Sequence, residues 1–571
     1  MSAQELITDH LHLWTGAVKK KSTSGRGSNG KIELTGIKKL RELILELAVR
    51  GKLVEQNPEE QPAQLVLERI NQEVERQVNA GQRKKPKPTS LISDDEVPFQ
   101  TPDNWIWARL GALCELENGD RSKNYPNKSA LVATGIPFVN AGHIRNYEVN
   151  QDEMTFISED RFNLLRSGKF REGDILFCLR GSLGKVGIVK GLTQGAIASS
   201  LIIARPILQH SEYLLLYLKA PLAAKMVKQY DNGTAQPNLS GKDFGSFLVP
   251  VPPEDEQNRI VQKVDELMAL CDRLEQQTSD QIEAHETLVD TLLGTLTQSQ
   301  NATELAENWP RLAAHFDTLF TTEQSIDKLK QTILQLAVMG RLVEQNPGDK
   351  PAHSLRRQIA ETKEQLIQSG SLKKQKPIPS PQSGSIPFKI PTSWETVAFG
   401  EITFNRDAER IPVSVEERRK RSGIFDYYGA SGVIDSIDDY LFDSPLLLIG
   451  EDGANLINRS TPIAFIARGK YWVNNHAHVV DGVSENFLRY MCLYINAISL
   501  EPYVTGTAQP KMNQAKMNSI PVPLPPEDEQ IRIIQKVDKL MALCDQLKKR
   551  LNQASETRCQ LAETIVENAL Q

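Results

Sequence analysis

The chain has 571 residues, of which 40% are hydrophobic and 24% are charged, and its formal net charge is −5. This length predicts several domains, and the composition is ordinary for a globular protein. There is no run of 18 apolar residues, no basic and apolar signal-peptide pattern at the N-terminus, and no CxxC pair among the six cysteines. We therefore expect a cytoplasmic protein without a membrane span, a disulfide framework or a zinc cluster. Because the net charge is acidic, any nucleic-acid-binding surface has to be local.

Residues 1–39 are predicted to be an N-terminal extension and linker. Glu5–Val18 has the apolar spacing of a short amphipathic helix. The following stretch, Gly25–Ile32, nearly spells a P-loop, but Ile32 stands where the Mg²⁺-binding Ser or Thr belongs and no buried strand precedes it. Its Gly/Ser-rich composition favours a flexible linker instead.

Residues 40–97 are predicted to be a helical region that the chain repeats within 301–385. In the first copy one helix begins near Gly36 and a second spans Pro62–Ala80, followed by a basic, proline-rich linker and Pro102-Asp-Asn-Trp105. At an offset of 289, Ile333–Pro347 matches Ile44–Pro58 at 12 of 15 positions. The basic linker returns as Lys373, Lys374 and Lys376, and the tryptophan segment as Pro391-Thr-Ser-Trp394. This period is too long for a solenoid and indicates duplication of half the protein.

A second repeated stretch, Val249–Asp272 and Val522–Asp545, has 20 of 24 identical positions at an offset of 273. In each copy a double proline ends an extended segment, and three acidic residues follow, which suits a helix N-terminus. Apolar residues then recur at spacings of four and three, which predicts a seam for a partner helix. We expect long spacer helices over 251–300 and 524–571. The seam residues are Ile260, Val264, Leu267, Cys271 and Leu274 in the first copy, and Ile533, Val537, Leu540, Cys544 and Leu547 in the second.

The two halves diverge in residues 98–250 and 386–523, which we name the first domain and the second domain. Short β-like runs between turns, followed by a helical stretch, predict an α+β fold for both. These runs are 136–139, 174–177, 186–189 and 201–204, then 446–449, 463–466 and 471–473; the helical stretches are 212–228 and 485–498. Each domain also carries a shared Gly-Thr-Ala-Gln-Pro segment, the marker loop, at Gly233–Leu239 and Gly506–Met512. The residues therefore predict two α+β domains and two long helices whose seams pack in equivalent ways, in an internal repeat.

Both domains are rich in residues that read nucleic acid. Arg pairs with guanine, Asn and Gln pair with adenine, and Lys contacts phosphate. For any one of them taken singly, a polar loop residue is more often simply solvated. The candidates in the first domain are Arg121, Lys123, Asn140, Arg145, Arg180, Ser182, Lys185, Thr234, Gln236 and Asn238. Those in the second domain are Arg406, Tyr427, Tyr428, Asn455, Lys470, Asn474, Asn475, His476, Thr507, Gln509 and Lys511.

Signatures of catalysis are missing, so we expect no catalytic and no metal-binding residue. Gly181–Lys185 follows a predicted strand, but only two residues separate its glycines, and a tight turn explains it as well as a phosphate site. His476 and His478 lack a third ligand nearby, and strand alternation accounts for their spacing. Glu361-Thr-Lys363 has a nuclease-like spacing but lies in a predicted helix without a partner carboxylate.

Taken together, these features resemble the specificity subunit of type I restriction–modification systems. The resemblance rests on the two PPEDEQ helices, the paired LAVxGxLVEQNP segments, the two marker loops, the Pro-x-x-Trp segments and the variable blocks between them. It covers nearly the whole chain. The stretch Trp14–Ile44 looks like the extended branch of that family.

This resemblance implies that the domains are target-recognition domains, each reading one half of a bipartite, asymmetric site in double-stranded DNA. Two long antiparallel coiled-coil helices, each roughly 65 Å long, would separate the α+β domains and give a pseudo-twofold internal repeat. Two modification subunits would bind S-adenosylmethionine and methylate adenine, and two restriction subunits would use ATP and Mg²⁺ for translocation and cleavage. This chain would bind no cofactor and perform no bond chemistry.

Two other functions stay open from the residues alone. The seams also suit a coiled-coil scaffold whose domains bind proteins, and a stand-alone nuclease is a weaker third possibility. Sequence-specific retardation of DNA would separate the first two, and metal-dependent cleavage by the purified chain would favour the third.

Overall fold

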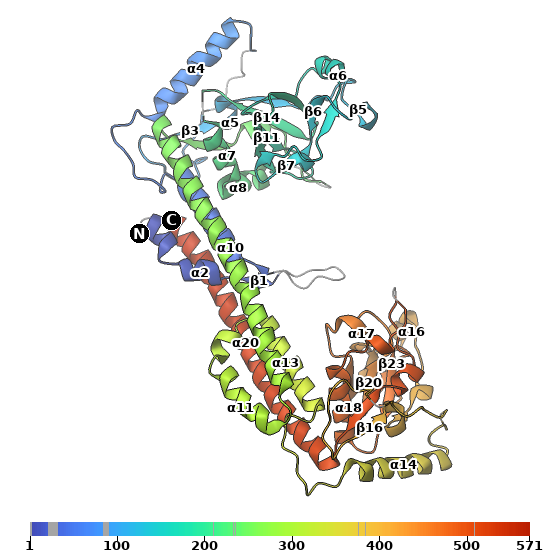
Figure 1. Ribbon diagram of the computed structural model, residues 1–571. Coiled ribbons are helices and arrows are strands. Elements are labelled where there is room, and N and C mark those ends of the chain that lie inside the picture. The colour runs from blue at the N-terminus through green and yellow to red at the C-terminus, as the bar shows by residue number, and fades with distance from the viewer. Residues whose placement is uncertain are drawn as a thin grey trace. The chain divides into compact units, whose positions relative to one another are not determined.

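The computed structural model describes residues 3–20, 32–83, 91–208, 210–231, 233, 236–374, 376–382, 384–506 and 509–570 (Figure 1). The chain divides into two compact units: unit 1 holds Met1–Asp280 and Ser555–Gln571, and unit 2 holds Gln281–Ala554. Each unit contains one α+β domain, so the predicted mixed fold with two domains and long helices is confirmed. None of the helices within the described residues has the length and apolarity that crossing a membrane requires.

The helical frame around each domain follows the repeat in the sequence. In unit 1 the frame helices are α1 (Ala3–Thr8), α2 (Leu11–Gly16), α3 (Thr35–Val49) and α4 (Ala63–Asn79). In unit 2 they are α11 (Ala302–Ala313), α12 (Phe316–Leu319), α13 (Glu323–Val338) and α14 (Ala352–Gln368). Both α4 and α14 begin directly after a proline, whose fixed φ and missing N–H suit the start of a helix.

The first domain has two main sheets and short helices around them. One sheet has the strand order β10-β13-β6-β9-β5, and the other has the order β4-β14-β11-β12-β8-β7. The strands are β4 (Cys114–Asn118), β5 (Leu131–Val132), β6 (Ile136–Val139), β7 (Ile144–Arg145), β8 (Glu148–Val149), β9 (Thr155–Ile157), β10 (Lys169–Arg171), β11 (Ile175–Cys178), β12 (Val186–Ile188), β13 (Gln194–Ile197) and β14 (Leu201–Pro206). The helices are α5 (Leu110–Leu113), α6 (Glu159–Leu164), α7 (Ser211–Lys219), α8 (Pro221–Tyr230) and α9 (Gly241–Gly245). The predicted helical stretch over 212–228 consists of two helices, α7 and α8, because Pro221 starts a new helix.

The second domain is built from fewer strands. Its sheets have the orders β17-β23-β20-β21 and β19-β18-β22, and α18 packs against β20 and β21. The strands are β17 (Phe404–Asn405), β18 (Phe425–Gly429), β19 (Gly432–Ile437), β20 (Leu446–Gly450), β21 (Ala464–Ala467), β22 (Tyr471–Val473) and β23 (Ala477–Asp481). The helices are α15 (Phe399–Ile402), α16 (Val415–Lys420), α17 (Asn455–Asn458), α18 (Glu485–Ala497) and α19 (Gln514–Asn518). The central strands β11 and β20 are buried along their whole length, as expected for a continuous apolar run.

A two-stranded antiparallel ribbon brings the start and the end of each domain together. In unit 1 it pairs β3 (Ile106–Arg109) with β15 (Leu248–Val251), and in unit 2 it pairs β16 (Glu395–Ala398) with β24 (Pro521–Leu524). Prolines are tolerated in β15 and β24 because a two-stranded ribbon has free edges. Each domain is therefore an insertion whose two ends meet at the start of a long helix.

The long helices are α10 (Glu254–Gln298) and α20 (Glu527–Leu570). Each begins after the double proline with three acidic residues in its first turn, where negative charge is favourable. α10 starts in unit 1 and its residues from Gln281 onward belong to unit 2. α20 starts in unit 2 and its residues from Ser555 onward belong to unit 1.

The seam residues of the two long helices pack in separate cores, each with its own unit. Ile260, Val264, Leu267 and Cys271 are buried in the core that contains α3, and Leu274 packs against it. Ile533, Val537 and Cys544 are buried in the core that contains α13, and Leu540 and Leu547 pack against it. The seam of α10 therefore packs in the same core as α3, and the seam of α20 packs in the same core as α13, the equivalent helix of unit 2.

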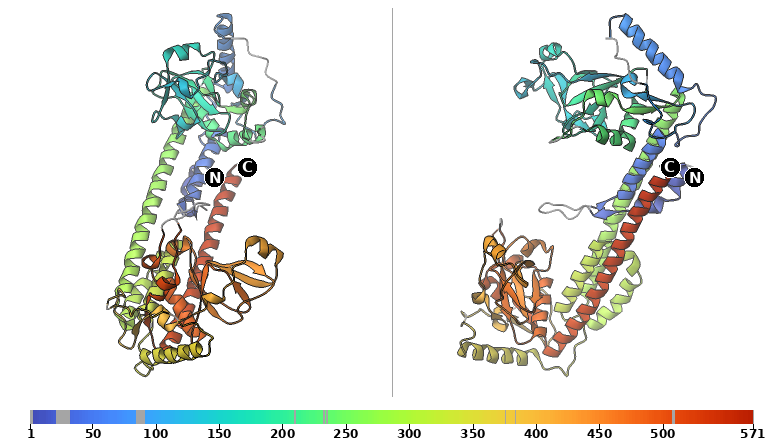
Figure 2. Two further views of the ribbon diagram at one scale, coloured as in Figure 1. Left: turned by 90° about the vertical axis from the view of Figure 1, so that its right-hand side faces the viewer. Right: turned by 180° about the vertical axis from the view of Figure 1, so that it is seen from behind.

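The N-terminal residues belong to the repeat and are more than an extension. The predicted helix over Glu5–Val18 is divided into α1 and α2, and a short strand pair, β1 (Lys19–Lys20) with β2 (Ile32–Glu33), follows. Ile7 and Trp14 are buried beside Cys559 and Ala562 of α20, so the two ends of the chain lie side by side in unit 1 (Figures 1 and 2). In unit 2, residues of α11 and α12 are buried beside the end of α10 in the same way. The equivalence of these two helical regions is also visible in the sequence, where Ala3-Gln-Glu-Leu6 corresponds to Ala302-Thr-Glu-Leu305.

Candidate nucleic-acid interface

Three repeated motifs converge on one buried carboxylate at the start of each long helix. In unit 1 the Oε2 atom of Glu256 accepts a hydrogen bond from Trp105 Nε1 at 2.9 Å, and Oε1 accepts one from Gln56 Nε2 at 2.6 Å. In unit 2 Glu529 accepts from Trp394 Nε1 at 2.9 Å and from Gln345 Nε2. Burial raises the pKa of both carboxyl groups, and the hydrogen bonds partly oppose that shift. We name each arrangement the clamp; it fixes the domain to its helix.

A glycine makes room for each clamp. Gly51 has φ +67°, and a Cβ atom there would lie 2.6 Å from Cγ of Pro102 and 3.1 Å from the Trp105 ring. Gly340 has φ +69° and the same neighbours in unit 2, Pro391 and Trp394. Only glycine combines this backbone conformation with such a close approach.

The marker loop of the first domain closes onto the residue that follows its central strand. Leu239 N donates to Leu179 O at 2.9 Å, and Arg180 pairs with Asn238 as an isolated bridge. Asp231 Oδ1 accepts from the backbone N–H groups of Gly233 (3.0 Å) and Asn238 (2.9 Å), and these bonds lower the pKa of Asp231. Asn238 Oδ1 accepts from Arg180 Nε at 2.8 Å, while the terminal nitrogens of Arg180 have no partner among the described residues. Asn238 therefore holds the exposed guanidinium of Arg180 through Nε, and no other described residue binds its two terminal nitrogens.

The marker loop of the second domain closes at the same structural position with different charges. Met512 N donates to Glu451 O at 2.8 Å, and Asp452 pairs with Lys511 as an isolated bridge. Thr505 and Lys511 exchange two backbone hydrogen bonds of 2.8 Å, which close the loop. Lys511 Nζ lies 3.2 Å from Glu451, and Asp452 contacts Nδ1 of His476 at 2.7 Å. An acidic residue thus stands where the first domain has Arg180.

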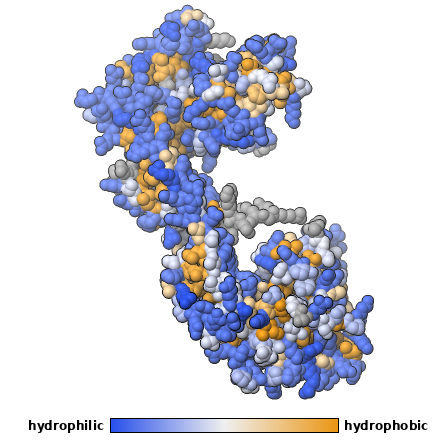
Figure 3. Space-filling view, in the orientation of Figure 1, coloured by the Kyte–Doolittle hydropathy of each residue, from blue (hydrophilic) through white to orange (hydrophobic). Residues whose placement is uncertain are grey.

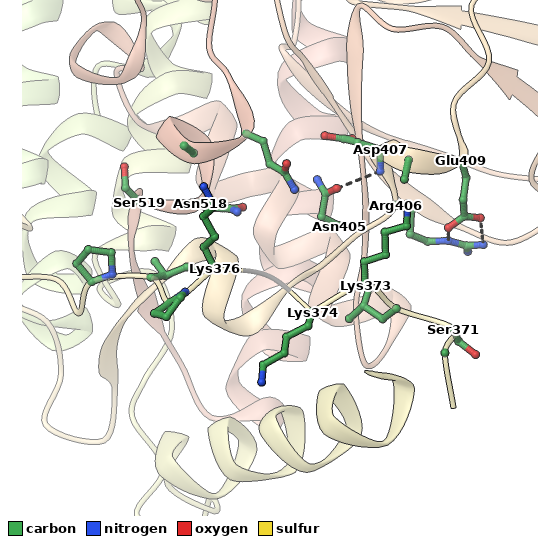
Figure 4. A pocket seen from close by; sticks show the side chains of 18 residues that line it. Ser371, Lys373, Lys374, Lys376, Asn405, Arg406, Asp407, Glu409, Asn518 and Ser519 are labelled. Atoms are coloured by element: carbon green, nitrogen blue, oxygen red, sulfur yellow. Dashed lines mark hydrogen bonds and ion pairs between the residues drawn. The ribbon is translucent and has the colours of Figure 1, made fainter. Parts of the chain in front are cut away.

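A groove of about 950 Å³ lies beside this loop, between the basic linker and the second domain (Figure 4). Lys373, Lys374 and Lys376 line one part of it. Across from them Arg406 forms a two-point contact with Glu409, at 2.7 and 2.6 Å. Asn405 accepts from Asp407 N through its Oδ1, and its Nδ2 has no partner among the described residues. The groove therefore offers exposed ammonium groups, which suit a phosphate-bearing chain, beside the carboxylates of Asp407 and Glu409.

The candidate residues of the first domain fall into two groups. Arg121, Lys123, Arg145, Arg180, Ser182 and Gln236 are exposed, and Asn238 is half-buried. Asn140 instead caps the short helix η2 (Ala141–His143), and Lys185 Nζ donates to Ala141 O at 2.6 Å. The turn at Gly181–Lys185 uses its own N–H groups, since Gly184 N donates to Cys178 O and Lys185 N to Ser182 O. It is a tight turn and not a phosphate cradle. Thr234 lies outside the described residues.

Two candidates in the second domain are wrong. Tyr427 is fully buried, and its hydroxyl accepts from Val413 N and donates to Val413 O. Asn474 is 5% exposed and accepts from His476 N. An aromatic ring on a strand and a short amide just after the neighbouring strand can be buried in the core as readily as they can read a base. No sequence pattern separates the two uses.

The other candidates of the second domain keep some access to solvent. Lys470, Asn475, His476, Gln509 and Lys511 are exposed, and Lys470 lies over the Tyr440 ring at 4.5 Å. Arg406 is held by Glu409, Tyr428 stacks on Phe465, and Asn455 closes a turn by accepting from Thr461 N. Thr507 lies outside the described residues. On the face seen in Figure 3, both units are largely hydrophilic.

The sequence prediction missed the acidic residues that organise the loops. Asp231, Glu451 and Asp452 were not candidates, and neither was Asp407, whose Oδ2 lies 2.7 Å from Nδ1 of His478. Acidic residues are expected to repel DNA, so composition gives no signal for them. Arg180 and Asp452 are equivalent because each follows a central strand and pairs with the same position of a marker loop. The sequence alone does not align these two residues, because the repeat offset changes inside the domains.

The two units share one helical frame and carry different side chains at the same loop. This arrangement is that of a two-domain specificity protein. A family model described as the type I restriction modification DNA specificity domain matches residues 102–284 and 391–556. Two relatives from Escherichia coli, the specificity subunits of the type I restriction enzymes EcoEI and EcoAI, are each 37% identical over the full length of both chains.

Solved structures of lower similarity also match. The HsdS subunit from Thermoanaerobacter tengcongensis is 16% identical, with a TM-score of 0.40, over 83% of this chain and 98% of that one. The family match and the full-length relatives lead to one conclusion: this chain belongs to the family of type I restriction–modification DNA specificity proteins and is a specificity subunit.

Proposed function

We propose that this chain reads a bipartite, asymmetric DNA site, with one half-site read by each domain. The observation that carries the proposal is the pair of marker loops. Both loops close on the residue after a central strand, yet the first presents Arg180 with Asn238 and the second presents Asp452 with Lys511 and His476. Equivalent positions with different donors and acceptors are what two readers of different base sequences need.

We further propose that the repeated frame docks two modification subunits, and that two restriction subunits join them. The chain itself carries no catalytic residue and no cofactor in this proposal. S-adenosylmethionine would bind to the modification subunits, and ATP and Mg²⁺ to the restriction subunits, in the cytoplasm. The two clamps support this because they give both units the same arrangement around the start of a long helix.

An exchange of one domain tests the proposal. Residues 106–247 are replaced by the matching block of the EcoEI specificity subunit, and methylated adenines are mapped genome-wide in cells that carry the modification subunits. We expect one half of the methylated sequence to change completely while the other half stays the same. The matched control exchanges residues 395–520 and should change only the other half. A change in both halves from either exchange would contradict independent reading.

The scaffold function predicts a different outcome. A protein-binding scaffold would show no preference between DNA sequences, with or without modification subunits. Retardation of DNA fragments with and without the mapped site, at fixed salt, distinguishes it, since only specific binding survives an excess of unrelated DNA.

A further inference from the structure

His478 is a buried histidine next to the marker loop of the second domain. It lies in β23, is 1% exposed, and pairs with Ile449 of the central strand β20. Its ring faces the short helix η3 (Asp407–Glu409) on one side and the end of the marker loop on the other. It therefore links the core of the second domain to the loop that is proposed to read DNA.

The two ring nitrogens of His478 both face acceptors. Nδ1 lies 2.7 Å from Oδ2 of Asp407, and Nε2 lies 2.8 Å from the backbone oxygen of Met512. A carbonyl oxygen and a carboxylate can only accept, so both nitrogens have to donate, which requires the imidazolium form. Asp407 stays ionised, since its Oδ1 also accepts from Val479 N at 2.8 Å and its pKa is lowered by the histidine despite burial.

The surrounding charges favour this protonated form. Glu451 lies 3.8 Å from Nδ1 of His478 and is itself bound by Arg410 at 2.8 Å and Lys511 at 3.2 Å. Arg410 also lies 3.6 Å from Asp407. Burial alone would lower the pKa of His478, but Asp407, Met512 and Glu451 together raise it.

We propose that protonated His478 is a positioning residue that holds the marker loop of the second domain in its reading conformation. Met512 is fixed on both sides, because its N–H donates to Glu451 O and its oxygen accepts from His478. When His478 loses one proton, the remaining hydrogen stays on Nδ1, because Nδ1 faces the anionic Asp407. Nε2 then faces the Met512 oxygen without a hydrogen, and the loop loses that bond. Reading of the second half-site then weakens as pH rises, whereas reading of the first half-site does not. The inference rests on the proposed function.

Among its described residues, the first domain has no such histidine at its marker loop. Its marker loop is held by Leu239 N on Leu179 O and by Asp231, and none of these groups titrates near neutral pH. Its buried histidine, His143, accepts from Asn140 N at 3.0 Å through Nδ1, which requires the neutral form, and burial lowers its pKa. The first half-site is therefore an internal control for every general effect of pH on the complex.

The test maps methylation in vitro at two pH values. The complex of the full chain with its modification subunits is given S-adenosylmethionine and unmethylated, amplified genomic DNA at about pH 6 and about pH 9, on either side of the range in which histidine titrates. The readout is how often a wrong base is accepted at each position of the methylated sequence, which does not depend on the overall rate. The domain exchange described above assigns each half-site to its domain.

We expect discrimination in the second half-site to fall by about tenfold at the higher pH, the effect of losing one hydrogen bond to a charged group. Discrimination in the first half-site should stay constant. His478→Gln should show the relaxed second half-site already at the lower pH, without a further change on raising it. The control His353→Gln, an exposed histidine on α14 in the same unit, should behave as the unaltered chain.

Other outcomes overturn the inference. If discrimination between bases stays constant in both half-sites at both pH values, or if it falls equally in both, His478 does not position the loop. The unaltered chain decides this even if His478→Gln does not fold. If no defined sequence is methylated at any pH, the proposed function itself fails, and the inference falls with it.

Discussion

The two units of this chain have the same frame but opposite charge chemistry at their marker loops. The clamp at Glu256 and the clamp at Glu529 use the same three residue types, with both tryptophan bonds at 2.9 Å. In contrast, the first domain has the exposed Arg180 where the second has the half-buried Asp452. The buried His143 of the first domain accepts a hydrogen bond through Nδ1, whereas both ring nitrogens of the buried His478 in the second domain face acceptors. After duplication, the contacts that attach each domain have been kept, and the contacts that hold each marker loop differ.

This difference has a physical reason. The clamp depends on one backbone geometry, with a positive-φ glycine against a proline and an indole, and few side chains fit it. A marker loop needs only to be closed, and different groups do this: a carboxylate on two N–H groups in the first domain, a pair of backbone hydrogen bonds in the second. The closure leaves the exposed side chains free to vary.

Removing the clamp tryptophan should have the largest effect on this shared frame. Trp105 and Trp394 are 6% and 5% exposed, and truncation of a buried tryptophan costs about 3–5 kcal/mol. Trp105→Ala should therefore destabilise unit 1, and Trp394→Ala should destabilise unit 2, by similar amounts in chemical denaturation. In methylation maps each should impair one half-site. Trp107→Phe, which keeps the clamp intact, is the control; equal losses from it and Trp105→Ala would show that the clamp adds nothing.

Much of the frame is predictable from the sequence because its signals are local. All seven β-like runs correspond to strands, and the helices after Gly36 and Pro62 and their repeats are present. Double prolines, acidic first turns and apolar spacing act within a few residues of the structure they specify. The division of the helix over 212–228 is an exception, although Pro221 signals it.

The site is predicted less well because its contacts are not local. His478 touches residues 71 and 34 positions away, and Arg180 touches one 58 positions away. Whether a tyrosine such as Tyr427 is in the core or on the surface depends on sheets that form across such separations. The N-terminal repeat went unnoticed for another reason: Ala-x-Glu-Leu is short, and only its equivalent packing on a long-helix end makes the match convincing.

The glycine beside each clamp should give an intermediate effect. Gly51→Ala combines an unfavourable φ with overlap on Pro102, and we expect a loss of about 2–3 kcal/mol in unit 1. Gly340→Ala should cost the same in unit 2, since its surroundings match. Gly81 and Gly370 also have positive φ but no atom within 4 Å of an added Cβ. Alanine there should cost only about 1 kcal/mol. Equal effects at Gly51 and Gly81 in denaturation curves would show that the close approach is not important.

The charge of the clamp carboxylate should matter least, and its effect should depend on pH. A carboxyl group with a raised pKa holds its proton more tightly in the folded chain than in the unfolded one. Its contribution to stability is fully present below the unfolded pKa of about 4.3 and is lost as pH rises through the folded pKa.

Glu256→Gln keeps an acceptor for Trp105 and removes this titration. We therefore expect the variant to differ from the unaltered chain by less than about 1 kcal/mol at neutral pH, and to lack the decrease in unfolding free energy above about pH 4. Glu529→Gln is the matched variant for unit 2. A loss as large as that of Trp105→Ala would mean that the clamp depends on an ionised carboxylate, and that the frame shared by the two units is electrostatic more than it is steric.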